Sequence, residues 1–93
     1  MTLTDRQYLY DVISLDLGTT RTDLAQGLTK KINSITILDL GGGTLSFKLN
    51  ASSNDSITAS DGLKIDGIPV TEIYWTNVLQ AGVTAIIFIV WVD

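Results

Sequence analysis

Two short motifs in this 93-residue chain combine aspartate with glycine and threonine, the residue types that hold nucleotide phosphates. The first is Asp-Leu-Gly-Thr-Thr at 16–20, and the second is Leu-Asp-Leu-Gly-Gly-Gly-Thr at 38–44. Glycine-rich turns let backbone N–H groups approach a phosphate closely, and a carboxylate beside them can hold a hydrated Mg²⁺. The two motifs together therefore raise the hypothesis of a phosphate-binding site.

Each motif resembles one of the two phosphate loops of the actin and heat-shock ATPase superfamily. In that superfamily the two loops belong to separate lobes, and the nucleotide lies between them. Asp16 and Asp39 lie close together in a chain of only 93 residues, which leaves no room for two lobes. We therefore expect two strand-to-turn transitions, where aspartate and glycine are favoured because they form local hydrogen bonds.

The composition argues against most other catalytic and metal chemistry. The chain has no histidine and no cysteine, so the commonest general base and the zinc-binding thiolate are missing. Glu72 is the only glutamate, and the aspartates lack the spacing of an EF-hand, so Asx turns explain them better than a calcium site. We predict no catalytic residue, no cofactor and no metal site.

Three aromatic residues are candidates for a platform on which sugar rings stack. Tyr74 and Trp75 are adjacent on a predicted strand, so they point to opposite faces and one of them is expected in the core. Trp91 lies at the end of an apolar strand and is expected in the core or in an interface. A carbohydrate- or cell-surface-binding module, as part of a tail or fibre, is therefore the alternative function.

The charge balance limits the classes of partner. Lysine and arginine total 6 and aspartate and glutamate total 10, which gives a net charge of −4 and argues against binding to nucleic acid. The longest apolar run, residues 85–92, is far shorter than the about 20 residues of a membrane helix. Charged residues make up 17% of the chain against about 25% in average proteins. We therefore expect no membrane partner and a surface that is partly covered by other protein.

Short segments of alternating polarity predict an all-β domain. The turn signals at short intervals are typical of a small β-sandwich or jelly-roll-like fold of about seven short, mainly antiparallel strands. We expect a loop over 18–29 and a hairpin turn at Asp66-Gly67, and Pro69 indicates an edge or a bulge. The predicted strands span residues 12–17, 31–40, 45–50, 56–58, 63–65, 72–77 and 83–92.

We predict an N-terminal arm over residues 1–10 and a single domain over 11–93. The final strand is apolar on both faces, so one face is expected in the core and the other against a partner. Alternation does not decide between the set Ile87, Ile89, Trp91 and the set Ile86, Phe88, Val90. The candidate assembly residues are three from the arm together with the first set: Leu3, Tyr8, Tyr10, Ile87, Ile89 and Trp91.

From about residue 11 onward, the order of features resembles small virion proteins of tailed bacteriophages. The resemblance is carried by Asp-Leu-Gly-Thr-Thr-Arg-Thr-Asp at 16–23, by Ile-Tyr-Trp-Thr-Asn at 73–77 and by Gln-Ala-Gly at 80–82. It implies a non-enzymatic β-sandwich component of the virion, made in the host cytoplasm. Capsid decoration or a minor head role is most expected, and tail or baseplate roles stay open. The implied partners are copies of the chain, with a trimer favoured, and the major capsid or other virion proteins.

Overall fold

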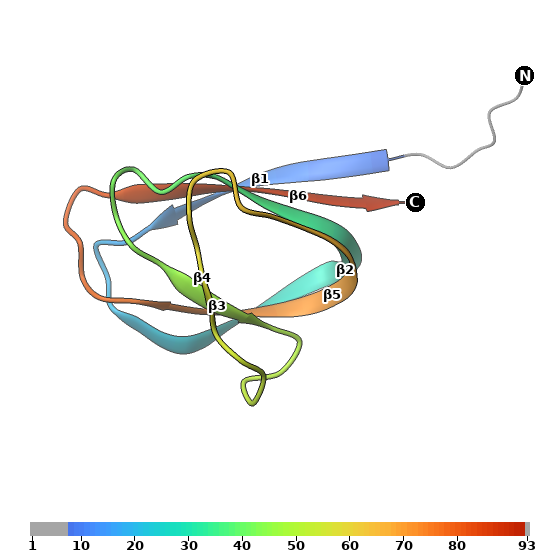
Figure 1. Cartoon of the computed structure of the whole chain (residues 1–93), viewed down its shortest axis with the longest axis horizontal. Helices are drawn as coiled ribbons and strands as arrows, with labels where there is room; N and C mark the ends of the chain where they lie inside the picture. The colour runs from blue at the N-terminus through green and yellow to red at the C-terminus, as the bar shows by residue number, and fades with distance from the viewer. Residues whose placement is uncertain (1–7, 93) are drawn as a thin grey trace, which may run out of the picture.

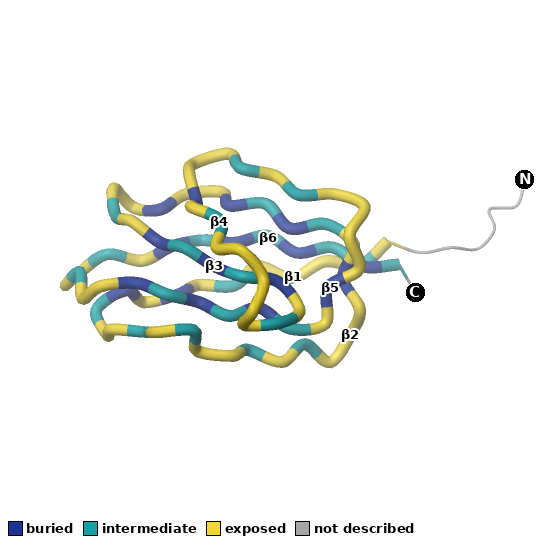
Figure 2. The backbone as a smooth tube through the Cα atoms, turned by 60° about the horizontal axis from the view of Figure 1, so that its bottom comes forward, coloured by how far each residue is buried: buried dark blue, intermediate teal, exposed yellow. Residues whose placement is uncertain are grey.

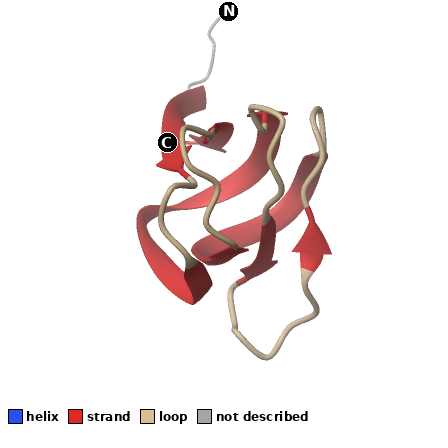
Figure 3. Ribbon diagram, turned by 90° about the vertical axis from the view of Figure 1, so that its left-hand side faces the viewer, coloured by secondary structure: helices blue, strands red, loops and turns tan. Residues whose placement is uncertain are grey.

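The computed structural model describes residues 8–92. The regular secondary structure in this range consists of β-strands alone (Figures 1 and 3). All strand pairs are antiparallel, and the sheet order is β1-β6-β2-β5-β3-β4. The strands are β1 (Tyr8–Asp16), β2 (Arg21–Asp39), β3 (Ser46–Leu49), β4 (Ile57–Thr58), β5 (Lys64–Asn77) and β6 (Thr84–Val92).

The two long strands β2 and β5 shape the molecule. They curve together at one end, so that β1 and β6 lie over β3 and β4 (Figure 1). The first part of β2, from Arg21 to Gly27, pairs with the last part of β5, whereas Ser34–Thr36 lie between β5 and β6. A single sheet therefore folds over its own inner face.

The sequences of both long strands account for the bend. The β2–β5 register shifts between Gly27 and Ile32 and again between Ile32 and Ser34. The facing part of β5 contains Gly67, with a φ of +81°, and Pro69, which has no N–H to donate. Irregular pairing of this kind bends a strand and increases its twist. The indication of an edge or bulge at Pro69 is confirmed.

The inner face carries a continuous apolar core. Trp75 and Phe47, both 1% exposed, pack with ring centroids 5.6 Å apart, and Ile73 and Ile87 are fully buried beside them. Buried and half-buried residues alternate along β6, as expected for a strand with one face toward the core (Figure 2).

The all-β, antiparallel prediction is confirmed, and six strands are close to the about seven expected. The strands form one continuous sheet, and the finer prediction of a sandwich is not confirmed. Residues 21–29, predicted as a loop, belong to β2. The predicted strands at 63–65 and 72–77 join into β5, because Asp66-Gly67 lies within a bent strand and forms no hairpin.

The boundary of the predicted arm also changes. Tyr8, Leu9 and Tyr10 pair with Val92, Trp91 and Val90, so they begin β1 and are part of the sheet. Gly27 does not end the strand, because it pairs with Glu72 within β2. Leu3 and the rest of residues 1–7 lie outside the described part of the chain.

Candidate functional site

The outer face of β1 and β6 is an apolar surface of the sheet that is partly open to solvent. Residues directly opposite each other in an antiparallel pair share a face, and the register joins Tyr10 to Val90 and Val12 to Phe88. We call this surface the β1–β6 face, and it consists of Tyr8, Tyr10, Val12, Ser14, Ile86, Phe88, Val90 and Val92.

Large apolar side chains on this face are open to solvent. Tyr8 is 70% exposed, Tyr10 65% and Val12 53%, and the four β6 residues of the face are half-buried. The rings of Tyr10 and Phe88 lie 5.2 Å apart and pack against each other. None of the eight residues of the β1–β6 face is charged.

Polar residues border the face on its β2 and β5 side. Ser34 and Thr36 lie opposite Val90 and Phe88, and beyond them on β5 an ion pair of 3.5 Å joins Lys64 to Asp66. An apolar centre with a polar rim is the arrangement of protein–protein interfaces. The geometry therefore suits this face to contact with another protein.

The structure corrects part of the predicted assembly set. Ile87, Ile89 and Trp91 are 0%, 5% and 9% exposed and face the core, so they are not part of the exposed outer face of β6. The other set, Ile86, Phe88 and Val90, points outward. Hydropathy does not separate the two sets because both faces of β6 are apolar; the core that forms on one side of the folded sheet does. Tyr8 and Tyr10 lie on the exposed face as part of the sheet.

β1 also forms an edge of the sheet. Among the described strands it pairs with β6 alone, over nine residues in unbroken register. It contains no proline, no lysine and no bulge; Asp11 and Asp16 are its only charged residues, and charges are among the features that oppose strand addition at an edge. The opposite edge strand, β4, has only two residues. The long free edge of β1 is therefore the one suited to pairing with another strand.

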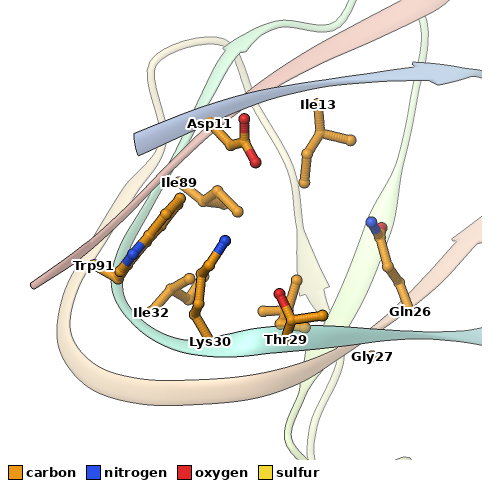
Figure 4. A pocket seen from close by; sticks show the side chains of 10 residues that line it. Asp11, Ile13, Gln26, Gly27, Thr29, Lys30, Ile32, Ile89 and Trp91 are labelled. Atoms are coloured by element: carbon orange, nitrogen blue, oxygen red, sulfur yellow. The ribbon is translucent and has the colours of Figure 1, made fainter. Parts of the chain in front are cut away.

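A pocket of about 190 Å³ lies between β1 and the bend of β2 (Figure 4). Its volume is smaller than the about 300–1,000 Å³ of most ligand sites, so it fits a single side chain. The Lys30 Nζ lies 4.4 Å from the centre of the Trp91 ring, and Asp11 enters from the opposite side. The lining residues are Asp11, Ile13, Gln26, Gly27, Leu28, Thr29, Lys30, Ile32, Ile89 and Trp91.

The two aspartate–glycine motifs form turns. The Gly18 N–H donates to Asp16 Oδ1 at 2.9 Å, and the Gly41 N–H donates to Asp39 Oδ1 at 2.8 Å. Both carboxylates therefore serve local hydrogen bonds, as expected for strand-to-turn transitions. Within residues 8–92, no group of three acidic side chains is close enough to hold a metal ion.

A buried amide connects the loops at one end of the sheet. Asn77 is 5% exposed; its Nδ2 donates to the carbonyl oxygens of Thr19, at 3.0 Å, and Val78, at 2.8 Å. Arg21 Nη1 donates to Asn77 Oδ1 at 3.0 Å and to the Asp16 carbonyl at 2.7 Å. Arg21 and Asn77, which belong to the segments that carry the bacteriophage resemblance, thus fix the connections between strands.

The three aromatic residues considered for sugar stacking do not form an exposed platform. Trp75 and Trp91 are 1% and 9% exposed, and the Trp75 Nε1 donates to Gln26 Oε1 at 2.8 Å. Tyr74 is half-buried on the opposite face of β5, where its hydroxyl donates to Glu72 Oε1. The prediction that Tyr74 and Trp75 point to opposite faces of one strand, with one of them in the core, is confirmed.

We expect Tyr74 to titrate above the ordinary range of tyrosine. Its hydrogen bond to Glu72 raises the pKa of the phenol, and burial and the charge of Glu72 act in the same direction. When the pKa of a group is higher in the folded chain than in the unfolded chain, the group stabilises the fold at pH values below its pKa in the unfolded chain. This stabilisation is lost as the pH rises through its pKa in the folded chain. In a pH titration of the tyrosine ring signals, Glu72→Gln should lower the Tyr74 pKa. An unchanged Tyr74 titration would contradict the assignment.

No described helix is long and apolar enough to span a membrane. Comparisons with protein-family models, with curated proteins and with solved structures found no match to the chain. The β1–β6 face, the free edge of β1 and the pocket beside that edge are the features from which function is inferred.

Proposed function

We propose that this chain is a non-enzymatic structural component of a tailed-bacteriophage particle. It attaches to other virion proteins through the β1–β6 face, most simply as a capsid decoration or minor head protein made in the host cytoplasm. The observation that carries the docking role is the uncharged apolar surface built by the exposed Tyr8, Tyr10 and Val12 with the half-buried Phe88 beside them. The placement in a virion rests on the sequence resemblance.

Burial of this face stabilises a complex because apolar surface leaves water. Each fully buried valine- or phenylalanine-sized side chain contributes about 1.5–3 kcal/mol. Tyrosine adds a large, stiff contact area and is enriched where proteins bind one another. The Tyr10–Phe88 pair sits within the face, where a binding anchor excludes water best. Burial of the face in a complex therefore favours non-covalent attachment.

Self-association belongs to the same proposal. A 93-residue chain buries a smaller share of its surface than larger domains do. Contact between copies covers apolar surface that the core of one copy leaves open. The free edge of β1 offers a second contact that is independent of the β1–β6 face, because backbone groups mediate it.

We predict that Phe88→Asp abolishes attachment to particles. Loss of the ring and burial of a carboxylate should weaken binding by at least about tenfold to a hundredfold. The measurement is co-sedimentation of purified chain with particles of the parent virus that lack this protein. Leu79→Asp is the matched control: Leu79 is 62% exposed but lies in the β5–β6 turn, away from the face.

Leu79→Asp should bind like the unmodified chain. Equal binding by Phe88→Asp and the unmodified chain would exclude the face as the docking surface. An unmodified chain that does not bind particles but binds glycans on an array would overturn the virion proposal in favour of the carbohydrate-binding alternative.

A further inference from the structure

The pocket between β1 and the bend of β2 carries opposite charges on its two walls. Asp11 points into it from β1, and Lys30 points into it from β2 (Figure 4). We propose that this pocket binds a small zwitterion, in which a short aliphatic chain joins an ammonium group to a carboxylate. The proposal goes beyond the docking role of the β1–β6 face, because the pocket lies on the other face of β1.

Asp11 is a charged residue in an otherwise apolar row. Side chains alternate between the two faces of a strand, so Asp11 shares the inner face of β1 with Ile13 and Leu15. Ile13 and Leu15 pack in the core, whereas Asp11 is exposed at the pocket. An inward-pointing charge on an edge strand opposes pairing with a further strand. That role does not require a cation on the facing wall, which Lys30 provides.

An aromatic ring holds the Lys30 side chain at the pocket. The Lys30 Nζ lies 4.4 Å from the centre of the Trp91 ring, and a cation in this position is attracted by the ring electrons. Trp91 is itself 9% exposed, so the contact keeps the ammonium beside the pocket. Within residues 8–92 the ion pairs lie elsewhere in the fold, and none joins Lys30 to Asp11. Each of the two charges is therefore able to bind a group that enters the pocket.

The space between the two charges suits a short aliphatic chain. The pocket has a volume of about 190 Å³, which equals about six water molecules at about 30 Å³ each. Its apolar lining includes Ile13, Ile32 and Ile89, and the last two are 1% and 5% exposed. Methylene groups that enter the pocket leave water and contact these side chains, which stabilises the complex.

The two charges disfavour ligands that carry only one charge or none. A simple anion bound to Lys30 is repelled by the Asp11 carboxylate, and a simple cation bound to Asp11 is repelled by the Lys30 ammonium. An uncharged ligand displaces water from both side chains without replacing its hydrogen bonds, which is unfavourable. A zwitterion places its ammonium beside Asp11 and its carboxylate beside Lys30, where charge-assisted hydrogen bonds are strong.

Titration with ε-aminocaproate, followed by the backbone amide signals in NMR, tests the proposal. This probe carries both charges, whereas caproate and hexylamine have a chain of the same length and one charge each. The signals of Asp11 and Lys30 should shift, and that of Leu79 in the β5–β6 turn should not. Both single-charge probes should bind at least about tenfold more weakly, because one charged contact is lost. Absence of binding, or equal binding of caproate or hexylamine, would overturn the proposal.

Substitution of either charged residue should weaken the binding of ε-aminocaproate. Asp11→Asn and Lys30→Gln each remove one charge with little change in side-chain size, and should raise the dissociation constant at least about tenfold. Asp55→Asn and Lys31→Gln are the matched controls, because they remove the same charges at exposed residues that do not line the pocket. Both controls should bind like the unmodified chain, with folding checked by circular dichroism. Unchanged binding by Asp11→Asn and Lys30→Gln would overturn the proposal.

Two peptides distinguish the sources of the zwitterion. A peptide that ends in lysine with a free carboxylate carries both charges, and its amidated form lacks the carboxylate. Binding of the free-acid peptide alone assigns the pocket to the C-terminal lysine of a protein, whereas binding of ε-aminocaproate without either peptide assigns it to a free small molecule. Phe88→Asp should bind ε-aminocaproate like the unmodified chain, so this proposal and the docking role of the β1–β6 face fail independently.

Discussion

Replacing Ile87 by aspartate should unfold the domain, whereas replacing Phe88, the next residue along β6, should leave it folded. Ile87 is 0% exposed and lies in the core, where a carboxylate has no hydrogen-bond partner. Burying an unpaired charge costs several kcal/mol, and a domain of this size is stable by only about 5–14 kcal/mol. Phe88 is half-buried on the outer face of the sheet beside Tyr10, so an aspartate there keeps contact with water.

Circular dichroism during thermal and urea unfolding measures this difference. Ile87→Val is the control, because it changes the same side chain without adding a charge. It should lower the free energy of unfolding by about 0.5–1.5 kcal/mol. Phe88→Asp should keep the circular dichroism spectrum of a β-strand protein. Its free energy of unfolding should fall by no more than about 1 kcal/mol. A folded Ile87→Asp with nearly unchanged stability would mean that the two faces of β6 are assigned the wrong way round.

Replacing Asn77 by alanine should destabilise the domain by about 2–4 kcal/mol. The buried amide donates to the carbonyl groups of Thr19 and Val78 and accepts from Arg21, so its removal leaves several polar groups without a partner. Each buried polar group left unsatisfied costs about 1–3 kcal/mol. Because these bonds connect the β1–β2 and β5–β6 turns, one substitution loosens both.

Urea unfolding monitored by tryptophan fluorescence measures the loss for Asn77. Val78→Ala, next to Asn77 but 66% exposed, should change the free energy of unfolding by less than about 0.5 kcal/mol. Arg21→Lys keeps the charge but not the planar group, and should fall between the two. An Asn77→Ala variant as stable as Val78→Ala would show that the loops do not depend on this amide.

The sequence predicts the parts of the fold that follow from local patterns. The alternation of Leu45, Phe47 and Leu49 predicts the half-buried strand that β3 forms. The two Asp-Leu-Gly motifs predict turns because their hydrogen bonds lie within two residues, and both bonds are present at Asp16 and Asp39. These features need no knowledge of distant contacts.

The parts that the sequence did not predict depend on pairing between distant segments. The strand character of residues 21–29 depends on pairing with β5, because their composition alone is typical of a loop. Asp66-Gly67 has the sequence of a hairpin turn, yet it bends β5 because β2 continues beside it. The outward face of β6 is set by the core on the other side, since Ile87 and Phe88 are similarly apolar. The free edge of β1 is likewise a property of sheet order.

Hydroxyl-radical footprinting of the chain on particles tests the central claim most directly, because it reports which side chains a partner covers. The account predicts strong protection of Tyr10 and Phe88 on the β1–β6 face when the chain is bound. Leu79, an exposed residue of the β5–β6 turn, should be oxidised equally in free and bound chain. Protection of Leu79 with unchanged oxidation of Tyr10 and Phe88 would contradict the assignment of the docking surface.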